Sequence, residues 1–281
     1  MMQRKTALIT GCSEGGLGEA LAKAFVDRGF YVFATLRNTA KAGVLAQLEN
    51  VAIIELEATS AESAQTAAKI VSKQTNGALD VLVNNAGADF VIPLLDVNLD
   101  DAKKLYDLNV WSILAMSQAF APLLIKATGS ICNICSTAAC MPFAYAGIYS
   151  SSKIAAERLS DTLRIELAPL GVKVITGMIG AVQTPIHNNA GELQLPEDSY
   201  YQSVKGIISA QRQGEHKPGS QHRDAVAMSI VDDIVSGKSG NIWRGGLASV
   251  VRFLAAFMPA VLEHIVNQNK GLRILKKTHT A

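Results

Sequence analysis

Short apolar runs alternate with helix-length amphipathic stretches along most of this chain, and this rhythm restricts the possible fold more than any other feature. The apolar runs, which we expect to be strands, are residues 7–9, 31–34, 51–54, 81–83, 131–134 and 172–175. Helical patterns follow the first three of them, over residues 17–27, 41–48 and 61–73. Strands separated by helices pair in parallel through right-handed crossovers. The rhythm therefore predicts a single-domain α/β fold, a doubly wound parallel sheet with helices on both faces.

The composition agrees with one globular domain. The chain has 281 residues, 49% of them hydrophobic and 18% charged, which is typical of a folded protein with a full core. A net charge of +2 gives no support for a nucleic-acid partner. The first residues lead directly into an apolar strand, without the apolar segment and cleavage site of a secretory signal, so we expect a cytoplasmic protein.

The cysteines favour a reducing compartment and no metal. Cys12, Cys132, Cys135 and Cys140 lie in segments expected to be strand or glycine-rich loop, where buried free thiols are the preferred interpretation. Cys132-x-x-Cys135 resembles half of a zinc site, but no second Cys or His pair follows at ligand spacing.

The rhythm breaks between about residues 183 and 220, where prolines and Gly191 interrupt polar sequence. Such a region within a compact enzyme is typical of a substrate lid. We therefore predict a catalytic domain over 1–240 that includes this lid, and a C-terminal extension over 241–281 on or near the substrate pocket. The apolar run from Leu247 to Leu262 is interrupted by Arg252 and Pro259 and is shorter than the ~20 residues of a spanning helix. It is expected to cover the pocket, to contact a partner subunit or to lie on a membrane surface.

A glycine-rich turn from Thr10 to Gly18 connects the first strand to the first helix. Glycines there let backbone N–H groups approach a pyrophosphate at a helix N-terminus, so the turn predicts dinucleotide binding in a Rossmann-type fold. The second strand ends in Thr35-Leu36-Arg37, without the acidic residue that binds the ribose 2′-hydroxyl of NAD. Arg37 offers a planar fork for a 2′-phosphate, and the Ser13 hydroxyl offers a hydrogen bond. NADPH or NADP+ is therefore the predicted cofactor, with Arg37 as an ordinary surface residue the alternative.

Tyr149 and Lys153 are four residues apart, which places a phenol beside an ammonium group on a helix. The unperturbed phenol pKa is ~10, and a nearby cation favours the phenolate and lowers that value. Such a pair suits proton transfer to or from a reacting oxygen. The spacing alone also occurs on ordinary helix surfaces.

Taken together, these residues resemble the short-chain dehydrogenase/reductase family, from Thr6 to about Thr184. The glycine turn resembles the family's Thr-Gly-x-x-x-Gly-x-Gly with one residue added, which leaves the roles of Gly15 and Gly16 open. Residues 84–87 resemble the family's Asn-Asn-Ala-Gly element, which steadies the sheet. Ser136, thirteen residues before Tyr149, and Asn109 in Leu-Asn-Val match the family's serine and asparagine.

The resemblance implies the residues of an active site. The catalytic set is Ser136, Tyr149, Lys153 and Asn109. The cofactor-binding set is Gly11, Ser13, Glu14, Gly16, Leu17, Arg37, Glu57, Asn84, Ala86, Gly87, Tyr149, Lys153, Gly180, Val182 and Thr184. The sequence departs from the family pattern twice: Glu57-Ala58 stands where Asp-Val is common, and Ile179 replaces the proline of a Pro-Gly pair.

The resemblance also implies a mechanism. Tyr149 would protonate a carbonyl oxygen that Ser136 polarises. Lys153 would lower the tyrosine pKa and hold the nicotinamide ribose, and Asn109 would position a water that restores the proton. Within the family, the chain looks most like the fungal branch related to NADPH-dependent 1-acyldihydroxyacetone-phosphate reductase. This implies reduction of a ketone or aldehyde on a lipophilic molecule of lipid or secondary metabolism, such as an acyl-dihydroxyacetone phosphate or a polyketide ketone.

Other interpretations stay open. The same site would serve an NADP-dependent, steroid-like alcohol dehydrogenase, and a catalytically silent nucleotide-binding scaffold is an alternative of another class. The resemblance suggests a homodimer or homotetramer through the helices that carry Asn109 and Tyr149. The C-terminal segment would allow peripheral contact with a membrane or lipid droplet.

The sequence indicates less clearly which residues would contact the substrate. Several apolar and aromatic residues are candidates either for the pocket or for core and subunit packing: Met141, Pro142, Phe143, Tyr145, Tyr200 and Tyr201. A second group of basic residues is a candidate either for phosphate recognition or for solvated surface: His187, His216, Lys217 and Arg223.

Overall fold

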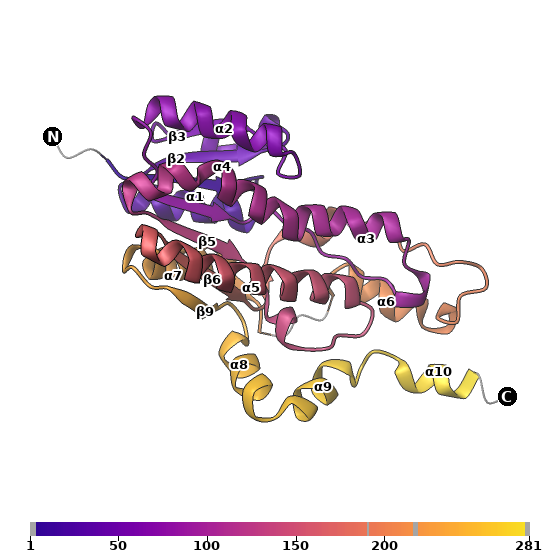
Figure 1. Ribbon diagram of the computed structural model, residues 1–281. Coiled ribbons are helices and arrows are strands. Elements are labelled where there is room, and N and C mark those ends of the chain that lie inside the picture. Colours follow the sequence, from indigo (N-terminus) through magenta and orange to yellow (C-terminus); the bar gives the residue numbers. More distant parts are fainter. Residues whose placement is uncertain (1–3, 190, 216–218, 279–281) are drawn as a thin grey trace.

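A seven-stranded parallel sheet forms the centre of the molecule, in the order β3-β2-β1-β4-β5-β6-β9 (Figure 1). The computed structural model describes residues 4–189, 191–215 and 219–278. The strands are β1 (Thr6–Thr10), β2 (Tyr31–Leu36), β3 (Val51–Glu55), β4 (Val81–Asn84), β5 (Ser130–Ile134), β6 (Lys173–Ile179) and β9 (Gly240–Arg244). The strand order reverses between β1 and β4, and ligands of such sheets bind at the carboxyl ends of the strands beside that reversal. The predicted doubly wound fold is confirmed.

Helices cover both faces of the sheet, which explains why its central strands are apolar without alternation. On one face, α1 (Leu17–Asp27) and α7 (Arg223–Val235) pack into a core that contains Phe25 and Ile230. On the other, α2 (Ala61–Gln74) and α4 (Ser112–Ala127) build a second core around Phe33 and Phe120, and α5 (Gly147–Leu167) adjoins it. The two cores hold the strand ends, and therefore the loops that follow them, in fixed positions.

The connection between β2 and β3 differs from the helix expected over 41–48. It forms two 3-10 turns, η1 (Thr39–Lys41) and η2 (Gly43–Gln47). Gly43, the first residue of η2, has a φ of 53°, which lies in the left-handed region that interrupts an α-helix. A Cβ at this glycine would lie 2.9 Å from Cδ of Glu14, so the turn also makes room for the glycine-rich loop.

One long helical segment joins α3 (Leu99–Tyr106), a π-helical turn (Asp107–Trp111) and α4. By length and composition this stretch, Leu99–Ala127, could cross a membrane. Half of its most apolar window is buried inside the molecule, and Met116 and Phe120 pack in the core beneath the sheet. We therefore assign it to the core.

The region expected to form a lid contains short elements. These are β7 (Val182–Gln183), the 3-10 turns η7 (Pro185–Asn189) and η8 (Gln202–Val204), α6 (Lys205–Arg212) and β8 (Gln221–His222), which pairs in parallel with β7. The chain then returns to the sheet as β9. The predicted extension begins within this strand and continues as α8 (Ala248–Phe257), α9 (Pro259–Asn267) and α10 (Leu272–Thr278), drawn in yellow along the lower edge of Figure 1.

Candidate active site

The glycine-rich turn has the backbone geometry of a phosphate cradle. Gly11 and Gly15 have φ values of 74° and 82°, a region that L side chains rarely adopt. Gly16 is extended and precedes the first turn of α1, so the two central glycines differ in backbone conformation. A Cβ at Gly18 would lie 2.4 Å from the Gly11 carbonyl oxygen, so only glycine fits this contact. Cys12, Glu14, Gly15 and Gly16 donate their backbone N–H groups to acceptors within the protein, which fixes the shape of the turn. The turn leads directly into the N-terminus of α1, where the helix dipole favours a pyrophosphate.

A buried carboxylate that the sequence did not reveal supports this turn. The Glu19 carboxylate accepts a hydrogen bond from Gly15 N at 2.9 Å and pairs with Arg223 Nη1 at 2.7 Å. The Glu19 side chain is only 4% exposed, and Arg223 also reaches the Gly16 carbonyl oxygen. Arg223, a candidate for phosphate recognition or for the solvated surface, is thus tied to the turn. The acidic residue in the first turn of α1 was the only available signal for this pair.

The strand ends on either side of the sheet's reversal are linked by side chains. Asn85 Nδ2 donates to the carbonyl oxygens of Thr10 at 2.8 Å and Gly11 at 3.2 Å. The Thr10 hydroxyl accepts from the backbone N–H groups of Asn85 and Ala86, each at 2.9 Å. These bonds fix the glycine turn to the Asn-Asn-Ala-Gly segment. Leu17 lies half-buried at the start of α1.

Asn84, expected among the cofactor contacts, points into the sheet. Its Nδ2 donates to Asn133 Oδ1 at 2.8 Å, and Asn133 in turn donates to the Ser160 hydroxyl at 2.8 Å. Asn84 is 4% exposed, so its side chain connects β4 to β5 and α5. This arrangement matches the expectation that the segment steadies the sheet.

The residues expected at the adenosine end lie at the carboxyl ends of β2 and β3. Arg37 Nη1 lies 3.9 Å from Glu57 Oε2, and their side chains are 77% and 42% exposed. Ser13 and Glu14 are exposed at the tip of the glycine turn nearby. The Arg37 guanidinium is therefore held only by a long, solvated contact and is accessible to an anion.

Gly180, Val182 and Thr184 follow β6, at the same edge of the sheet. A Cβ at Gly180 would lie 2.1 Å from the Gly246 carbonyl oxygen, so glycine is required where the strand passes the segment after β9. Gly180 N donates to the Arg244 carbonyl oxygen at 2.9 Å. Val182 and Thr184 are half-buried.

Asn109 lies in the π-helical turn between α3 and α4, a local geometry that often marks functional sites. Its side chain is almost fully buried. Oδ1 accepts from Ala88 N at 3.0 Å, and Nδ2 donates to the Ala88 carbonyl oxygen at 3.0 Å and to Ser152 Oγ at 3.1 Å. A Cβ at Gly87 would lie 3.1 Å from Asn109 Oδ1 and 3.4 Å from Lys153 Nζ. The glycine therefore lets these two catalytic candidates lie side by side.

Ser136, Tyr149 and Lys153 meet where β5 and the start of α5 approach each other. Ser136 follows β5, and its hydroxyl accepts from Ala138 N at 3.1 Å, which caps the 3-10 turn η5 (Thr137–Cys140). Tyr149 and Lys153 lie in the first two turns of α5, with Lys153 Nζ 5.8 Å from the centroid of the Tyr149 ring. Lys153 is 6% exposed, and its Nζ donates to the Ile134 carbonyl oxygen at 3.3 Å.

The electrostatics of this group differ from the expectation that Lys153 lowers the tyrosine pKa. Burial raises the pKa of Tyr149 above its ordinary value, and the negative charge of Asp89 raises it further. A hydrogen bond with Ser136 acts in the opposite direction. Burial also lowers the pKa of Lys153, while Cys135 and Asp89 favour its charged form. Tyr149 is therefore a protonated phenol at neutral pH, the state that a proton donor requires.

Asp89 is a second residue that the sequence did not reveal. Its Oδ2 lies 3.0 Å from His187 Nδ1, and the two side chains are 16% and 9% exposed. The pair joins the segment after β4 to η7 in the lid region. His187, a candidate for phosphate recognition or for the solvated surface, is thus largely buried beside an acid, whereas His216 and Lys217 lie outside the described residues.

The cysteines are not suited to act as nucleophiles at this site, although Cys135 Sγ donates to the Lys153 carbonyl oxygen at 3.0 Å. All four are free thiols, and burial raises the pKa of Cys12 and Cys132 to about 12. Thiols of this kind are poor nucleophiles. In the described part of the chain, no group of three or more His, Cys, Asp or Glu side chains is placed to hold a metal.

The fold and the site define a class of protein. A phosphate cradle beside the reversal of a parallel sheet, with a serine, a phenol and a buried amine at the next strand end, fits an oxidoreductase that uses a nicotinamide dinucleotide. Gly11, Gly18 and Gly87 lie at close contacts within the protein, and these contacts bring the turn, residues 84–87 and the catalytic candidates together at one edge of the sheet, which supports the fit.

Comparison with known proteins agrees with this class of protein. Residues 5–194 match the short chain dehydrogenase family model. The short-chain dehydrogenase cctT of Talaromyces islandicus is 48% identical over 271 residues, which cover 95% of this chain and 96% of cctT. The NADPH-dependent 1-acyldihydroxyacetone phosphate reductase of Schizosaccharomyces pombe is 40% identical over 216 residues, or 75% of this chain and 73% of that protein.

Among solved structures, a short-chain dehydrogenase from Streptomyces avermitilis superimposes with a TM-score of 0.76 at 29% identity, covering 97% of this chain and 98% of that one. The chain belongs to the short-chain dehydrogenase family, and the predicted resemblance is confirmed. It is therefore an oxidoreductase that acts on a carbonyl or alcohol group with a nicotinamide cofactor.

Proposed function

We propose that this enzyme uses NADPH to reduce a ketone or aldehyde on a lipophilic molecule. The observation that carries the proposal is the group of Ser136, Tyr149, Lys153 and Asn109, in which Asn109 and Lys153 are buried beside Gly87, Ser136 and Tyr149 are half-buried, and Tyr149 is protonated. A protonated phenol suits reduction, because reduction consumes a proton at the carbonyl oxygen. Alcohol oxidation is the reverse of the same proton and hydride transfer at this site, and the ratio of NADPH to NADP+ decides the net direction.

The reaction assigns one task to each residue. When bound, NADPH would supply the hydride that the carbonyl carbon needs and would leave as NADP+. The Tyr149 hydroxyl gives its proton to the carbonyl oxygen, so that the carbonyl becomes an alcohol. The Ser136 hydroxyl donates a hydrogen bond to the same oxygen as negative charge develops on it. Lys153 holds the nicotinamide ribose and places a positive charge beside the phenolate that remains. Asn109, fixed by Ala88 and Ser152, orients the path along which the proton is restored.

The preference for NADPH rests on Arg37. The described end of β2 carries no carboxylate in the position that would bind a ribose 2′-hydroxyl, and the guanidinium there is largely exposed. Glu57 lies close enough to orient Arg37 toward an incoming 2′-phosphate. The S. pombe relative, named as NADPH-dependent, supports the same choice.

The proposal that the substrate is lipophilic rests on the residues between Ser136 and Tyr149. Tyr145 and the half-buried Tyr201 pack with Leu193 and Ile208 in a small, largely buried apolar cluster that joins this segment to the lid region. An acyl-dihydroxyacetone phosphate or a polyketide ketone has an apolar body, which would lie over this cluster rather than within it. The S. pombe protein, a named 1-acyldihydroxyacetone phosphate reductase, supports the first of these substrate classes.

The proposal also includes subunit contacts and the location of the enzyme in the cell. Exposed apolar residues on the helical segment of Asn109 and on α5, including Trp111, Ile154 and Ile165, would form the contact in a homodimer or homotetramer. Free, buried cysteines agree with the reducing cytoplasm. The exposed apolar residues of α8 and α9 would give peripheral contact with a membrane or lipid droplet.

A carbonyl panel tests the proposed activity. The purified protein is incubated with NADPH or NADH and with acyl-dihydroxyacetone phosphates, steroid ketones or polyketide ketones, and cofactor oxidation is followed by absorbance. We expect turnover with NADPH on at least one lipophilic carbonyl. Tight nucleotide binding without turnover on any member of the panel would instead support a catalytically silent scaffold.

A further inference from the structure

The segment between the catalytic serine and tyrosine is held by the far end of the chain. Asn267, the last residue of α9, accepts a hydrogen bond on Oδ1 from Ala144 N at 2.8 Å. Its Nδ2 donates to the Pro142 carbonyl oxygen at 2.9 Å. A single side chain thus satisfies a backbone donor and a backbone acceptor of this segment, residues 141–146, in the way that a neighbouring strand would.

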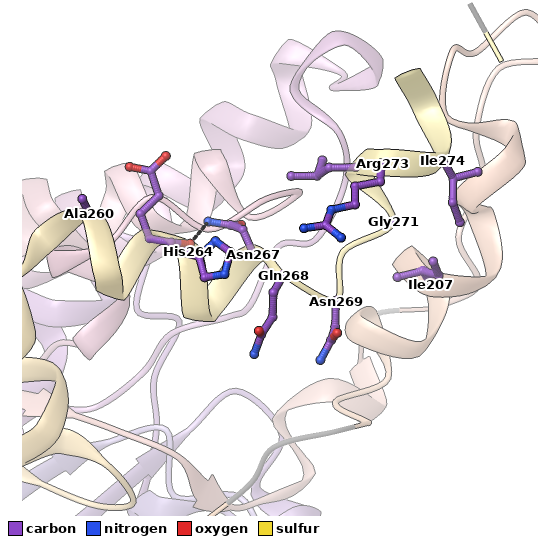
Figure 2. Close-up of a pocket in the computed structure, with 11 residues that line it drawn as sticks. Ile207, Ala260, His264, Asn267, Gln268, Asn269, Gly271, Arg273 and Ile274 are labelled. Carbon is purple, nitrogen blue, oxygen red and sulfur yellow. Dashed lines mark hydrogen bonds between the residues drawn. The ribbon is translucent and has the colours of Figure 1, made fainter. Parts of the chain in front are cut away.

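Asn267 is itself fixed in place. Its Nδ2 also donates to the Glu263 carbonyl oxygen one turn earlier in α9, at 2.9 Å. Figure 2 shows this bond and shows Asn267, Gln268 and Asn269 following one another along the wall of an open hollow between α9, α10 and α6. Gln268 and Asn269 are exposed, whereas Asn267 is half-buried. Of these three consecutive amides, Asn267 is the one that bonds the segment.

Tyr145 is the second point of attachment. Its hydroxyl donates to the Lys270 carbonyl oxygen, just beyond α9, at 2.7 Å. Its own carbonyl oxygen accepts from Ile92 N at 2.7 Å, and its ring packs edge-on against Tyr201. Tyr145 has a φ of 67°, a conformation that is strained for a tyrosine and persists only where surrounding contacts hold it. The contact with Lys270 is one of those that hold it.

Further contacts attach the same segment to the extension and the lid region. Lys270 Nζ lies 4.4 Å from the centroid of the Phe143 ring. Gln211 Nε2, from α6, donates to the Ala144 carbonyl oxygen at 3.0 Å. In addition, α8 packs against η5, the turn that Ser136 caps. The extension therefore contacts both ends of the segment that separates the catalytic residues.

The position of the segment matters because α5 begins at Gly147, two residues after Tyr145, and Tyr149 lies in the first turn of that helix. A shift of Tyr145 would rotate the first turn of α5 and change the distance between the Tyr149 phenol and Ser136. Displacements of about 1 Å from productive geometry can cost about a hundredfold in rate.

We propose that the C-terminal extension positions the active site, and that Asn267 and Tyr145 are the positioning residues through which it acts. They act on Tyr149 and Ser136 through the backbone of residues 141–146. The proposal rests on the proposed reductase function, since it concerns the same catalytic tyrosine. It assigns to the extension a role in turnover in addition to any role in covering the pocket.

Two variants with matched controls test the proposal in the full-length enzyme. Asn267→Ala removes the two bonds to the segment, and its control is Gln268→Ala at the exposed neighbouring amide. Tyr145→Phe removes only the hydroxyl that bonds Lys270, and its control is Tyr31→Phe, which removes a phenolic hydroxyl in β2, away from the site. Amide hydrogen exchange of residues 142–147 is measured for all four, together with kcat, KM, the pH profile and NADPH affinity.

We expect faster exchange at residues 142–147 and about tenfold lower kcat in both test variants, with NADPH affinity and both controls unchanged. The pH dependence of kcat should also move in the test variants, because the Ser136 hydrogen bond to Tyr149 changes. A lower melting temperature with unchanged kcat and pH profile would mean a purely structural role and would overturn the proposal. So would unchanged exchange.

Two further outcomes are also decided by this design. If Asn267→Ala does not fold, Tyr145→Phe, which removes a single oxygen atom, decides the question by the same measurements. If the wild-type enzyme reduces no carbonyl, the reductase proposal fails. The hydrogen-exchange comparison then still decides whether the extension holds residues 141–146.

Discussion

The active site has two sides that are built differently. The side that carries the reaction consists of strand ends and helix starts anchored in the two large cores, where Asn109 is 1% exposed and Lys153 is 6% exposed. The side that we propose faces the substrate rests on a small cluster of Val91, Tyr145 and a few residues of the lid region, held by the extension. Local stability follows buried apolar contact, so the first side is expected to be rigid and the second adaptable.

This difference indicates that the reaction and the choice of substrate depend on different residues. On the reaction side, glycines lie at close backbone contacts and asparagines are buried. Most substitutions there would therefore disturb packing or remove a hydrogen bond. On the substrate side, the contacts are single hydrogen bonds and ring edges that other side chains could replace. A family built this way can keep one reaction while the accepted substrate changes. Substitutions on the two sides should therefore differ in kind as well as in size.

The largest effect is expected for Tyr149→Phe, on the reaction side. The variant lacks the proton donor but keeps the ring and its packing, so kcat should fall by about 10²–10⁴-fold, the typical contribution of general acid catalysis. NADPH affinity, measured by fluorescence titration, should change little. Turnover retained near the wild-type rate would show that another group donates the proton.

Gly18→Ala should act on the same side through packing. The new Cβ would lie 2.4 Å from the Gly11 carbonyl oxygen, so the glycine turn must shift. Overpacking of this kind costs about 1–3 kcal/mol, and we expect a lower melting temperature and weaker binding of NADPH and NADH alike. Gly206→Ala in α6 is the matched control, because no atom lies within 4 Å of its added Cβ. Similar losses in both variants would mean that the close contact in the turn is not the cause.

Arg37→Asp tests the cofactor end of the reaction side. Loss of a charged hydrogen bond to the 2′-phosphate should cost about 1.5–3 kcal/mol, roughly a 10–150-fold rise in the Kd of NADPH. NADH lacks this phosphate and provides the internal control. Equal losses for the two cofactors would remove Arg37 as the selectivity determinant.

The reaction side is also the side for which the sequence named candidate residues most fully. Strands, the glycine turn, Arg37, Ser136, Asn109 and the Tyr149–Lys153 pair depend on local periodicity or on motifs of fixed spacing. The structure places the glycine turn and these side chains along the carboxyl edge of the sheet that the strands form. Family membership and the doubly wound fold are confirmed by the comparisons and the sheet order.

Contacts between distant segments were not predictable. The pairs Glu19–Arg223 and Asp89–His187 join residues far apart in the chain, and no spacing rule links their positions. The attachment of Asn267 to residues 142 and 144 is of the same kind. The expected helix over 41–48 failed for a local reason, the positive φ of Gly43. The tyrosine pKa was predicted in the wrong direction because burial cannot be read from the i,i+4 spacing.

Asp89→Asn probes the boundary between the two sides. The Asp89 charge raises the pKa of Tyr149, so removing it should lower that pKa. Reduction requires the protonated phenol, which exists below its pKa, so the alkaline limb of the kcat profile should move to lower pH. Turnover at neutral pH should change less than in the preceding variants. An alkaline limb that stays in place or moves to higher pH would contradict this assignment.

The smallest effect on turnover is expected on the outer surface of the extension. Phe253 and Phe257 of α8 are 57% and 72% exposed and stack with ring centroids 5.1 Å apart. If this surface contacts a membrane, the wild-type enzyme should float with phosphatidylserine-containing vesicles, and a Phe253→Ser, Phe257→Ser variant should not. Removing residues 246–281 should also abolish flotation.

Turnover of a water-soluble carbonyl should be the same in the double variant and the wild type, because neither phenylalanine contacts residues 141–146 by a hydrogen bond. Leu94→Ser, an exposed apolar residue outside the extension, is the control for loss of surface hydrophobicity. A wild-type enzyme that does not float, together with a double variant that changes oligomeric state, would assign this surface to a subunit contact. A fall in kcat of the double variant would instead show that the outer face of α8, like Asn267, helps to position the catalytic residues. The reaction side and the substrate side would then depend on each other more than their separate packing indicates.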